Sequence, residues 1–513
     1  MLEKIRRSRR VKGASRQAGF SLVELLVSLV IMAEILIGLL IVFDSSARLA
    51  REQTHVAELQ QSQRVAQAEL IRFAKRAGHG GLPVTMLNLP TGQPNNTSPI
   101  YETFGTFPLS GYALALRNNV DPATIIGVVN PGASDQGDDD VLPGSDVLIV
   151  RGVLTTPMYY VDPPIDIENW VDTSTDVFAG QITLPERART SGRSFWDYPQ
   201  DIDELSDRLL DAKTDSEPVA LIMRDTVNPN AYVIAAFDFA NTTNADLTPE
   251  DCPNLDVHDD TDTSDIPDCI QFNILLDPDE AGYGSSYADL STGTSLIAGE
   301  SNRTTLTVSP GPPAVELELP TKIGSIGLLE EYRFFVRTEW EVPGDTTTRL
   351  TPVLSRASFF PGTDEMIDRV DIADNVLDLQ ISMAADADAI GTAGYGLITD
   401  ENDDSDEILF NDPGDTVSAS APRNYTAPVG TPGAAQDTWY DTDLEFHYLR
   451  INTLVQGRFV DRDYVGPNLV EIEDQNRGTP FVVEGQTYAL NSAEEKRFRR
   501  RWLQTVVEMR SLQ

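Results

Sequence analysis

The most regular pattern in this chain is a long apolar run near its beginning, followed by apolar residues at helical spacing. From Phe20 to Phe43 nearly every side chain is apolar. A helix of this length can cross a bilayer of about 30 Å hydrocarbon thickness. The segment as far as Ala77 contains one glycine, Gly38, and no proline. We therefore predict one continuous helix of roughly 87 Å.

The second half of this helix carries an apolar stripe along one side. Apolar positions at near-heptad spacing predict that this side covers a folded domain. The positions of the stripe are Leu49, Val56, Leu59, Ala66, Leu70, Phe73 and Ala77.

From residue 78 onward, short runs of β-type residues alternate with segments rich in Gly, Pro, Asn, Ser and Asp. The predicted strands are Asp146–Val153, Met158–Val161, Gln181–Leu184, Val219–Arg224, Ala231–Phe239, Ile270–Leu276, Thr304–Val308, Val315–Leu319, Tyr332–Val342, Leu350–Phe359, Leu377–Met383, Tyr448–Val460 and Trp502–Met509. One further helix is predicted at Asp201–Lys213. The expected fold class is α+β, with a long N-terminal helix packed on a largely antiparallel β-sheet domain that carries long loop insertions.

The same pattern divides the chain into consecutive parts. We expect a leader at residues 1–19, a membrane-spanning helix at 20–43, its amphipathic continuation at 44–77 and an exterior β-rich domain at 78–513. Acidic insertions of low hydrophobicity interrupt this domain. They lie at about 84–145, 242–268 and 384–441.

Charge is the second strong feature of the sequence. The chain has 39 basic and 80 acidic residues and a net charge of −41. Residues 1–19 hold seven basic residues and one acid, so the chain without them carries 32 basic and 79 acidic residues and a net charge of −47. A basic segment before an apolar span keeps the start of the chain in the cytoplasm and places everything after Phe43 outside. So acidic an exterior argues against nucleic acid or anionic lipid as a direct ligand.

The chain contains only two cysteines, Cys252 and Cys269. Export to an oxidising compartment favours a disulfide between them. Closing this local loop is worth about 3 kcal/mol in the chain-entropy description. The four histidines are scattered along the chain, which disfavours a zinc site.

One acidic insertion has the alternating oxygen side chains of a calcium-binding loop. The candidate ligands are Asp400, Asn402, Asp404 and Asp406. Ser405 stands where such a loop requires glycine, and Asn411 stands where it requires a bidentate glutamate. A solvated acidic loop is the simpler interpretation, and a calcium site is the alternative. We expect no other cofactor.

The sequence contains none of the common catalytic motifs. Gly-x-Ser-x-Gly, His-Glu-x-x-His, the P-loop and the dinucleotide-binding glycine pattern are all missing. Pairs of acidic residues carry little information in so acidic a chain. We therefore expect a protein that is not an enzyme.

Glu24 is a carboxylate inside the apolar run, where an unpaired charge costs several kcal/mol. The stretch from Gly19 to Glu24 has glycine, an aromatic residue, a hydroxyl residue, an aliphatic pair and glutamate in order, and it resembles the class III signal of type IV prepilins and pseudopilins. The resemblance implies that a prepilin peptidase cuts between Gly19 and Phe20 and that Phe20 is N-methylated. It also implies that Glu24 pairs with the N-terminal amine of a neighbouring subunit in the filament core. An ordinary signal anchor with an incidental glutamate is the alternative.

Glu34 is a second carboxylate in the same run, about 15 Å beyond Glu24 along the helix axis and on a different face. One interpretation places it in the packed interior of a helical bundle or in its protonated form. The other makes it a second contact with a neighbouring subunit or with the assembly platform.

Several later stretches resemble PilW-type minor pilins. They are Phe73–Gly81 at the end of the helix, Gly144–Leu148, Tyr332–Val336, Leu354–Arg356, Val370–Met383 and Phe498–Arg510. The resemblance implies that Val370–Met383 is one strand ahead of a variable loop. Two departures are the Leu82 that stands where these proteins often have cysteine, and the greater length of this chain.

This resemblance implies a minor pilin of a type IV pilus that helps to initiate assembly and lies at or near the pilus tip. Before assembly it would cross the inner membrane once, with its N-terminus in the cytoplasm and its C-terminus in the periplasm, and it would then reach the cell surface. The implied partners are other minor and major pilins, the prepilin peptidase, the inner-membrane assembly platform and the membrane itself. Two alternatives stay open: a J-like pseudopilin of a type II secretion system, and a tip adhesin whose insertions bind a ligand through calcium.

Overall fold

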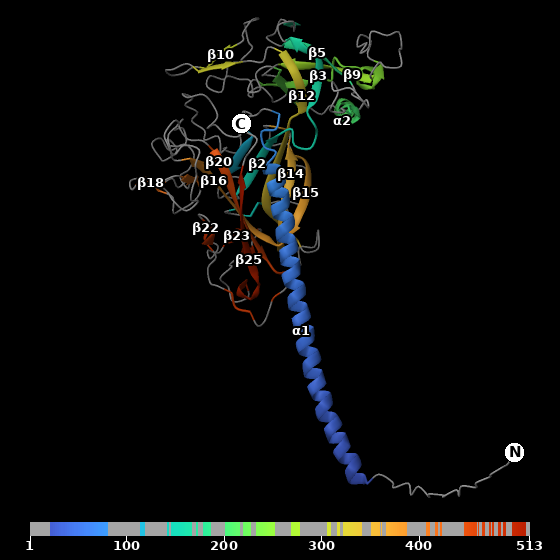
Figure 1. The fold of residues 1–513 in the computed structure, drawn as a ribbon, viewed down its shortest axis with the longest axis vertical. Helices are drawn as coiled ribbons and strands as arrows, with labels where there is room; N and C mark the ends of the chain where they lie inside the picture. Colours follow the sequence, from blue (N-terminus) through green and yellow to red (C-terminus); the bar gives the residue numbers. More distant parts are fainter. Residues whose placement is uncertain are drawn as a thin grey trace, which may run out of the picture. The chain divides into compact units, whose positions relative to one another are not determined.

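A computed structural model gives the fold of the chain (Figure 1). The residues that it describes are 21–80, 113–117, 141–142, 145–166, 171–172, 178–185, 201–215, 219–226, 232–251, 268–276, 305–308, 315–318, 322–340, 350–359, 361, 366–386, 407–410, 416–418, 421–422, 446–458, 460, 464–466, 471–472, 475–476, 481–483, 486–488 and 495–508. The chain divides into two compact units, Met1–Glu58 and Leu59–Gln513.

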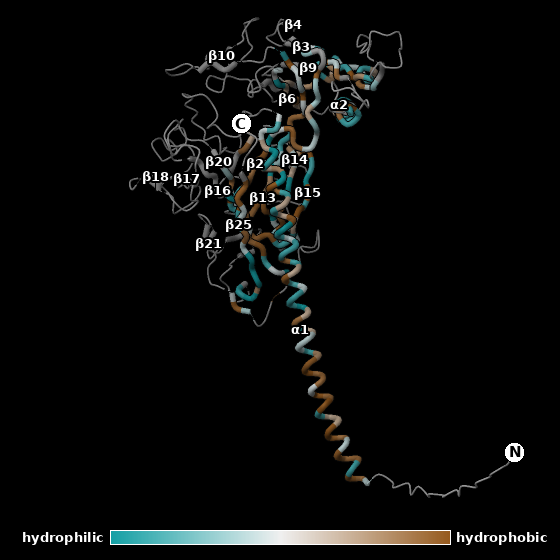
Figure 2. The backbone as a smooth tube through the Cα atoms, in the orientation of Figure 1, coloured by the Kyte–Doolittle hydropathy of each residue, from teal (hydrophilic) through white to brown (hydrophobic). Residues whose placement is uncertain are grey.

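Helix α1 (Leu22–Ala74) is continuous over 53 residues, as the sequence predicts, and it contributes to both units. Its apolar first half is exposed along its whole length, and by length and composition it could cross a membrane (Figure 2). In the second unit its apolar stripe is buried from Leu59 onward and packs against the β-sheets. The stripe was predicted to begin earlier, but Leu49 is exposed.

The first sheet has five antiparallel strands. In spatial order they are β1 (Leu114–Arg117), β2 (Val147–Gly152), β13 (Glu330–Trp340), β14 (Leu350–Phe359) and β15 (Met366–Asp374). Strands β13 and β14 are paired over their whole length, from Glu331 opposite Phe359 to Trp340 opposite Leu350. Alternation along β13 turns Tyr332 and Phe334 toward α1, where both rings contact Phe73.

The second sheet has four antiparallel strands, and α1 also packs on it. In spatial order they are β17 (Glu407–Phe410), β16 (Val376–Asp386), β20 (Phe446–Gln456) and β25 (Arg500–Glu508). The amide Nε2 of Gln67 donates to Thr453 Oγ1 (2.9 Å) and to the carbonyl oxygen of Leu503 (3.4 Å). These bonds tie the helix to β20 and β25.

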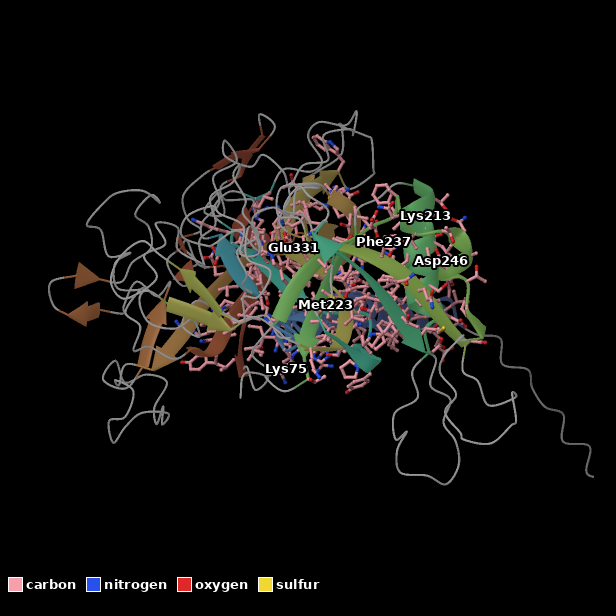
Figure 3. All side chains as sticks on the ribbon, turned by 90° about the horizontal axis from the view of Figure 1, so that it is seen from above. Lys75, Lys213, Met223, Phe237, Asp246 and Glu331 are labelled. Carbon is pink, nitrogen blue, oxygen red and sulfur yellow. The ribbon has the colours of Figure 1, made fainter. Side chains whose placement is uncertain are left out.

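The third sheet has eight strands, all joined antiparallel. They are β3 (Tyr159–Asp166), β12 (Lys322–Leu328), β6 (Ala220–Asp225), β7 (Tyr232–Phe237), β9 (Asp268–Leu276), β5 (Phe178–Pro185) and β4 (Val171–Asp172) in spatial order, with β8 (Glu250–Asp251) beside β9. Helices α2 (Asp203–Asp215) and α3 (Asn244–Leu247) belong to this part of the fold. Lys213 of α2 donates from Nζ to the carbonyl oxygens of Phe239 (2.6 Å) and Thr242, close to α3 (Figure 3).

Four short hairpins and a 3-10 turn complete the described elements. The hairpins are β10 (Thr305–Val308) with β11 (Val315–Glu318), β18 (Thr416–Ser418) with β19 (Ala421–Pro422), β21 (Glu471–Ile472) with β22 (Gln475–Asn476), and β23 (Phe481–Val483) with β24 (Gln486–Tyr488). The turn is η6 (Glu495–Arg497).

The predicted α+β class is confirmed: a long apolar helix is followed by antiparallel sheets. Every predicted strand overlaps an observed one, and the helix predicted at Asp201–Lys213 is α2. The expectation of a single strand over Val370–Met383 is wrong, because the chain turns at Asn375. This residue has φ 61°, so β15 ends before it and β16 begins after it, in another sheet. The prediction of loops is also incomplete, since short elements lie inside all three acidic insertions: β1 in the first, α3 and β8 in the second, β17 to β19 in the third.

Candidate functional site

The first described residues of α1 form a helix cap that includes Glu24. The backbone N–H of Ser21 donates to Glu24 Oε2 (3.0 Å), and the N–H of Val23 donates to Ser21 Oγ (3.3 Å). The two side chains thus satisfy two of the N–H groups that every helix leaves unpaired at its start. The bond from Ser21 N–H to Glu24 is one half of a capping box, whereas Ser21 Oγ accepts from the second residue of the helix and not from the third. A carboxylate is also favoured at this end of a helix by the helix dipole.

The cap gives Glu24 a role inside its own subunit that the sequence analysis missed. The signal was present, because Ser21 and Glu24 have the Ser-x-x-Glu spacing of a capping box before an apolar run. Gly19 and Phe20, the predicted cleavage and methylation residues, lie outside the described part of the chain. Cleavage, methylation and pairing between subunits therefore stay predictions.

Glu34 lies on α1 ten residues after Glu24, and its surroundings are different. Its side chain is exposed, and within the described residues it has no hydrogen bond or ion pair. The sequence from residue 17 to residue 47 contains no Lys, Arg or His. The apolar half of α1 thus carries two carboxylates and no base.

The other end of α1 is fixed to the first sheet by Arg356 of β14. Its Nη1 lies 2.5 Å from Glu69 Oε1, and its guanidinium lies 4.8 Å from the ring centroid of Phe73 and 5.1 Å from that of Tyr332. Because Glu69 and Phe73 are four residues apart, both lie on one face of the helix. One arginine therefore holds this face by a charge-assisted hydrogen bond and by cation–π contacts.

The turn after α1 extends this connection to β2. The N–H of Gly78 donates to the carbonyl oxygen of Arg151 (3.1 Å), and the N–H of Val153 donates to that of His79 (2.7 Å). Between them Gly152 has φ +148°, and a Cβ atom there would lie 3.0 Å from the His79 oxygen. The stretch at the helix end that resembles the pilin signature needs glycine for its own reason, because Gly78 and Gly80 have φ 76° and 103°, which other residues rarely adopt.

On the face of the first sheet that points away from α1 lies a fully buried group of three charged side chains. Arg151 Nε is 2.7 Å from Glu331 Oε2, and Arg333 Nη2 is 2.7 Å from Glu331 Oε1. Arg333 also lies 3.9 Å from the ring centroid of Phe359. Glu331 stands directly opposite Arg151 in the ladder, and Arg333 is two residues further along β13 on the same face. This arrangement is structural, since the three side chains are 0 % exposed.

The remaining predicted site residues are the two cysteines and the calcium candidates. Cys269 is buried in β9 and is disulfide-bonded, and Cys252 is the only other cysteine of the sequence. Cys252 itself lies outside the described residues, so their pairing stays a prediction. The calcium candidates between Asp400 and Asp406 lie outside them as well. Within the described ranges no cluster of three or more His, Cys, Asp or Glu side chains could hold a metal ion.

Comparison with known families gives one match. Residues 14–40 match the family described as prokaryotic N-terminal methylation motif. The matched segment includes Gly19, Phe20, Glu24 and Glu34. Comparisons with curated proteins and with solved structures gave no match.

Proposed function

We propose that this chain, a type IV pilin-like prepilin by its methylation motif, is a PilW-type minor pilin that helps to initiate a type IV pilus and lies at or near its tip. The observation that carries this proposal is the matched motif at the start of one continuous helix, which ends inside a β-sheet domain. Such a protein acts by assembly and not by catalysis. Its partners would be the prepilin peptidase, the assembly platform in the inner membrane and other pilins.

The proposed mechanism has three steps. The peptidase removes residues 1–19 and leaves a charged amine at Phe20. The apolar half of α1 holds the subunit in the inner membrane, with its β domain in the periplasm. Glu24 then meets the amine of a neighbouring subunit, and the paired helices leave the membrane together as part of a filament on the cell surface. An unpaired charge in a low-dielectric bundle costs about 3–5 kcal/mol, so pairing can decide which subunit joins next.

The attachment of α1 to the sheets supports a mechanical role in such a filament. The helix is hydrogen-bonded to the second sheet through Gln67 and held to the first by Arg356. The turn after it continues into the backbone of β2. Force applied to the helix would therefore reach two sheets through several bonds at once.

A complementation experiment tests the proposal. In a strain that lacks this gene, the wild-type chain should restore pili, and its mature form should begin at N-methyl-Phe20. Gly19→Val should keep the leader attached, and Glu24→Val and Glu24→Gln should insert into the membrane but fail to restore normal piliation. Full rescue by Glu24→Val, or a mature N-terminus at another residue, would contradict the proposal. Loss of protein secretion with normal pili would favour a type II secretion pseudopilin instead.

A further inference from the structure

The apolar half of α1 carries a second acidic residue, Glu34, to which the proposed mechanism assigns no role. Glu24 accepts a hydrogen bond from its own Ser21, whereas Glu34 has no such partner within the described residues. A charged carboxylate inside a membrane or a helical bundle is stable only where a cation meets it. Because the chain has no Lys, Arg or His from residue 17 to residue 47, that cation must come from another molecule.

The helix surface around Glu34 is suited to a close neighbour. Gly38 lies one turn further along the same face, and no atom lies within 4 Å of the position that a Cβ would take there. A small residue allows two helix backbones to approach each other closely in a membrane. The rest of this face is apolar and exposed, with Val30, Ile31 and Ile41 around the carboxylate.

We propose that Glu34 binds the N-terminal amine of a second pilin-type subunit, displaced by about 21 Å along the helix axis toward the C-terminal end of α1. This inference rests on the proposed function, which supplies the amine: every processed subunit carries one at the start of its apolar helix. The displacement is the axial rise over the 14 residues from Phe20 to Glu34. An amine that pairs with Glu24 belongs to a subunit displaced by only about 6 Å.

The two carboxylates therefore specify two different neighbours. Ten residues of helix separate them by about 15 Å along the axis and by about 80° around it. One neighbour cannot place a single amine at both positions, whereas two adjacent helices of a bundle can. Both neighbours are displaced toward the C-terminal end of α1, so the chain is not the outermost subunit of the filament.

Site-specific photo-crosslinking in pilus-producing cells tests this arrangement. A photoreactive amino acid replaces Ile31, which is one turn before Glu34, in the full-length chain. We expect a crosslink to a peptide that contains the mature N-terminal residues of a pilin-type subunit. The same probe at Leu36, on the opposite side of the helix, should not give this peptide.

The charge dependence separates pairing from simple proximity. Glu34→Gln should reduce the crosslink roughly tenfold, whereas Glu58→Gln, an exposed acid outside the apolar run, should leave it unchanged. A crosslink that forms with a pilin-type helix but lacks its N-terminal residues, or that persists in Glu34→Gln, overturns the inference and leaves the proposed function standing. If neither the probe at Ile31 nor the probe at Leu36 crosslinks to any pilin-type subunit, the inference and the proposed function are both wrong.

Discussion

The guanidinium of Arg356 lies against the carboxylate of Glu69, with 2.5 Å between Arg356 Nη1 and Glu69 Oε1. The two residues are 287 positions apart in the sequence, and both side chains are less than one-quarter exposed. The contact joins the long helix to β14 of the first sheet. Removing this contact by substitution therefore tests how strongly it attaches the helix to the domain.

Arg356→Ala should lower the free energy of unfolding by about 2–4 kcal/mol, because it removes a charge-assisted hydrogen bond and two cation–π contacts. Arg72→Ala is the matched control. Arg72 is 54 % exposed and lies 3.6 Å from the same Glu69, so its loss should cost less than about 1 kcal/mol. Urea unfolding of the full chain in detergent micelles measures both. Equal losses would show that the partly buried contact of Arg356 contributes no more than a surface ion pair.

Glu331→Gln should be among the most destabilising changes of a single atom in this domain. It leaves Arg151 and Arg333 buried without their shared countercharge, at a cost of about 3–5 kcal/mol. Asp368→Asn, an exposed acid on β15, should change stability by less than about 0.5 kcal/mol. Thermal unfolding compares the two variants. If the Glu331→Gln variant has the same melting temperature as the wild type, the two buried arginines do not need this carboxylate.

Gly152→Ala should destabilise the domain by about 1–3 kcal/mol, because the residue has φ +148° and an added Cβ would press on the His79 carbonyl oxygen. Gly38→Ala is the control: it adds the same methyl group to a helix position with nothing within 4 Å, so domain unfolding should be unaffected. The unfolding midpoint of each variant gives the answer. An unchanged midpoint for Gly152→Ala would contradict the need for glycine between β2 and the turn after α1.

Asp371 should make the domain sensitive to acid. Partial burial raises the pKa of its carboxyl group, but hydrogen bonds from Arg337 Nη2 (2.8 Å) and Ser355 Oγ (2.7 Å) outweigh this and lower the pKa below its ordinary value. Since the pKa is lower in the folded state, the unfolded state takes up the proton first as the pH falls. The stabilisation is therefore complete above the unfolded pKa, near 4, and is lost as the pH falls through the folded pKa.

The substitution Asp371→Asn isolates this effect. It should destabilise the domain at pH 7 and have a smaller effect at a pH below the unfolded pKa of about 4, because part of the wild-type stabilisation is already lost there. Denaturant unfolding at the two pH values measures the difference. If the substitution lowers the free energy of unfolding by the same amount at both pH values, Asp371 stabilises the domain by its packing and not by its charge.

We predict that the disulfide partner of Cys269 is Cys252, the only other cysteine. β8, which ends immediately before Cys252, pairs with the beginning of β9 at Cys269. Mass spectrometry of the unreduced protein should find the two cysteine peptides linked within one chain. Linkage between two chains, or two free thiols in an oxidising buffer, would contradict this pairing.

The long helix and its cap could be predicted from the sequence, because both depend on neighbouring residues. An apolar run without proline favours a helix wherever it is placed, and the Ser21 and Glu24 side chains reach backbone groups only a few residues away. Strands such as β14 were also predictable, since their β-branched and aromatic residues favour extended structure locally. Short strands such as β1, with four residues, were missed because their pairing depends on a distant partner.

The partners of the charged residues were decided by tertiary structure alone. Local spacing could not show that Arg356 meets Glu69, because the two residues are 287 positions apart. It could not show that Arg151 meets Glu331 either, because antiparallel pairing of β2 with β13 brings them together over 180 positions. Arg333 is only two residues from Glu331, but it shares that carboxylate with Arg151 only once these strands have paired. In a chain with 80 acidic residues, sequence cannot indicate which carboxylate a given arginine will meet. The sequence by itself determined a prepilin-type helix that ends in a β domain, since that information is local. Which sheet receives the helix, and which ion pairs hold it there, depends on contacts that exist only once the sheets have formed.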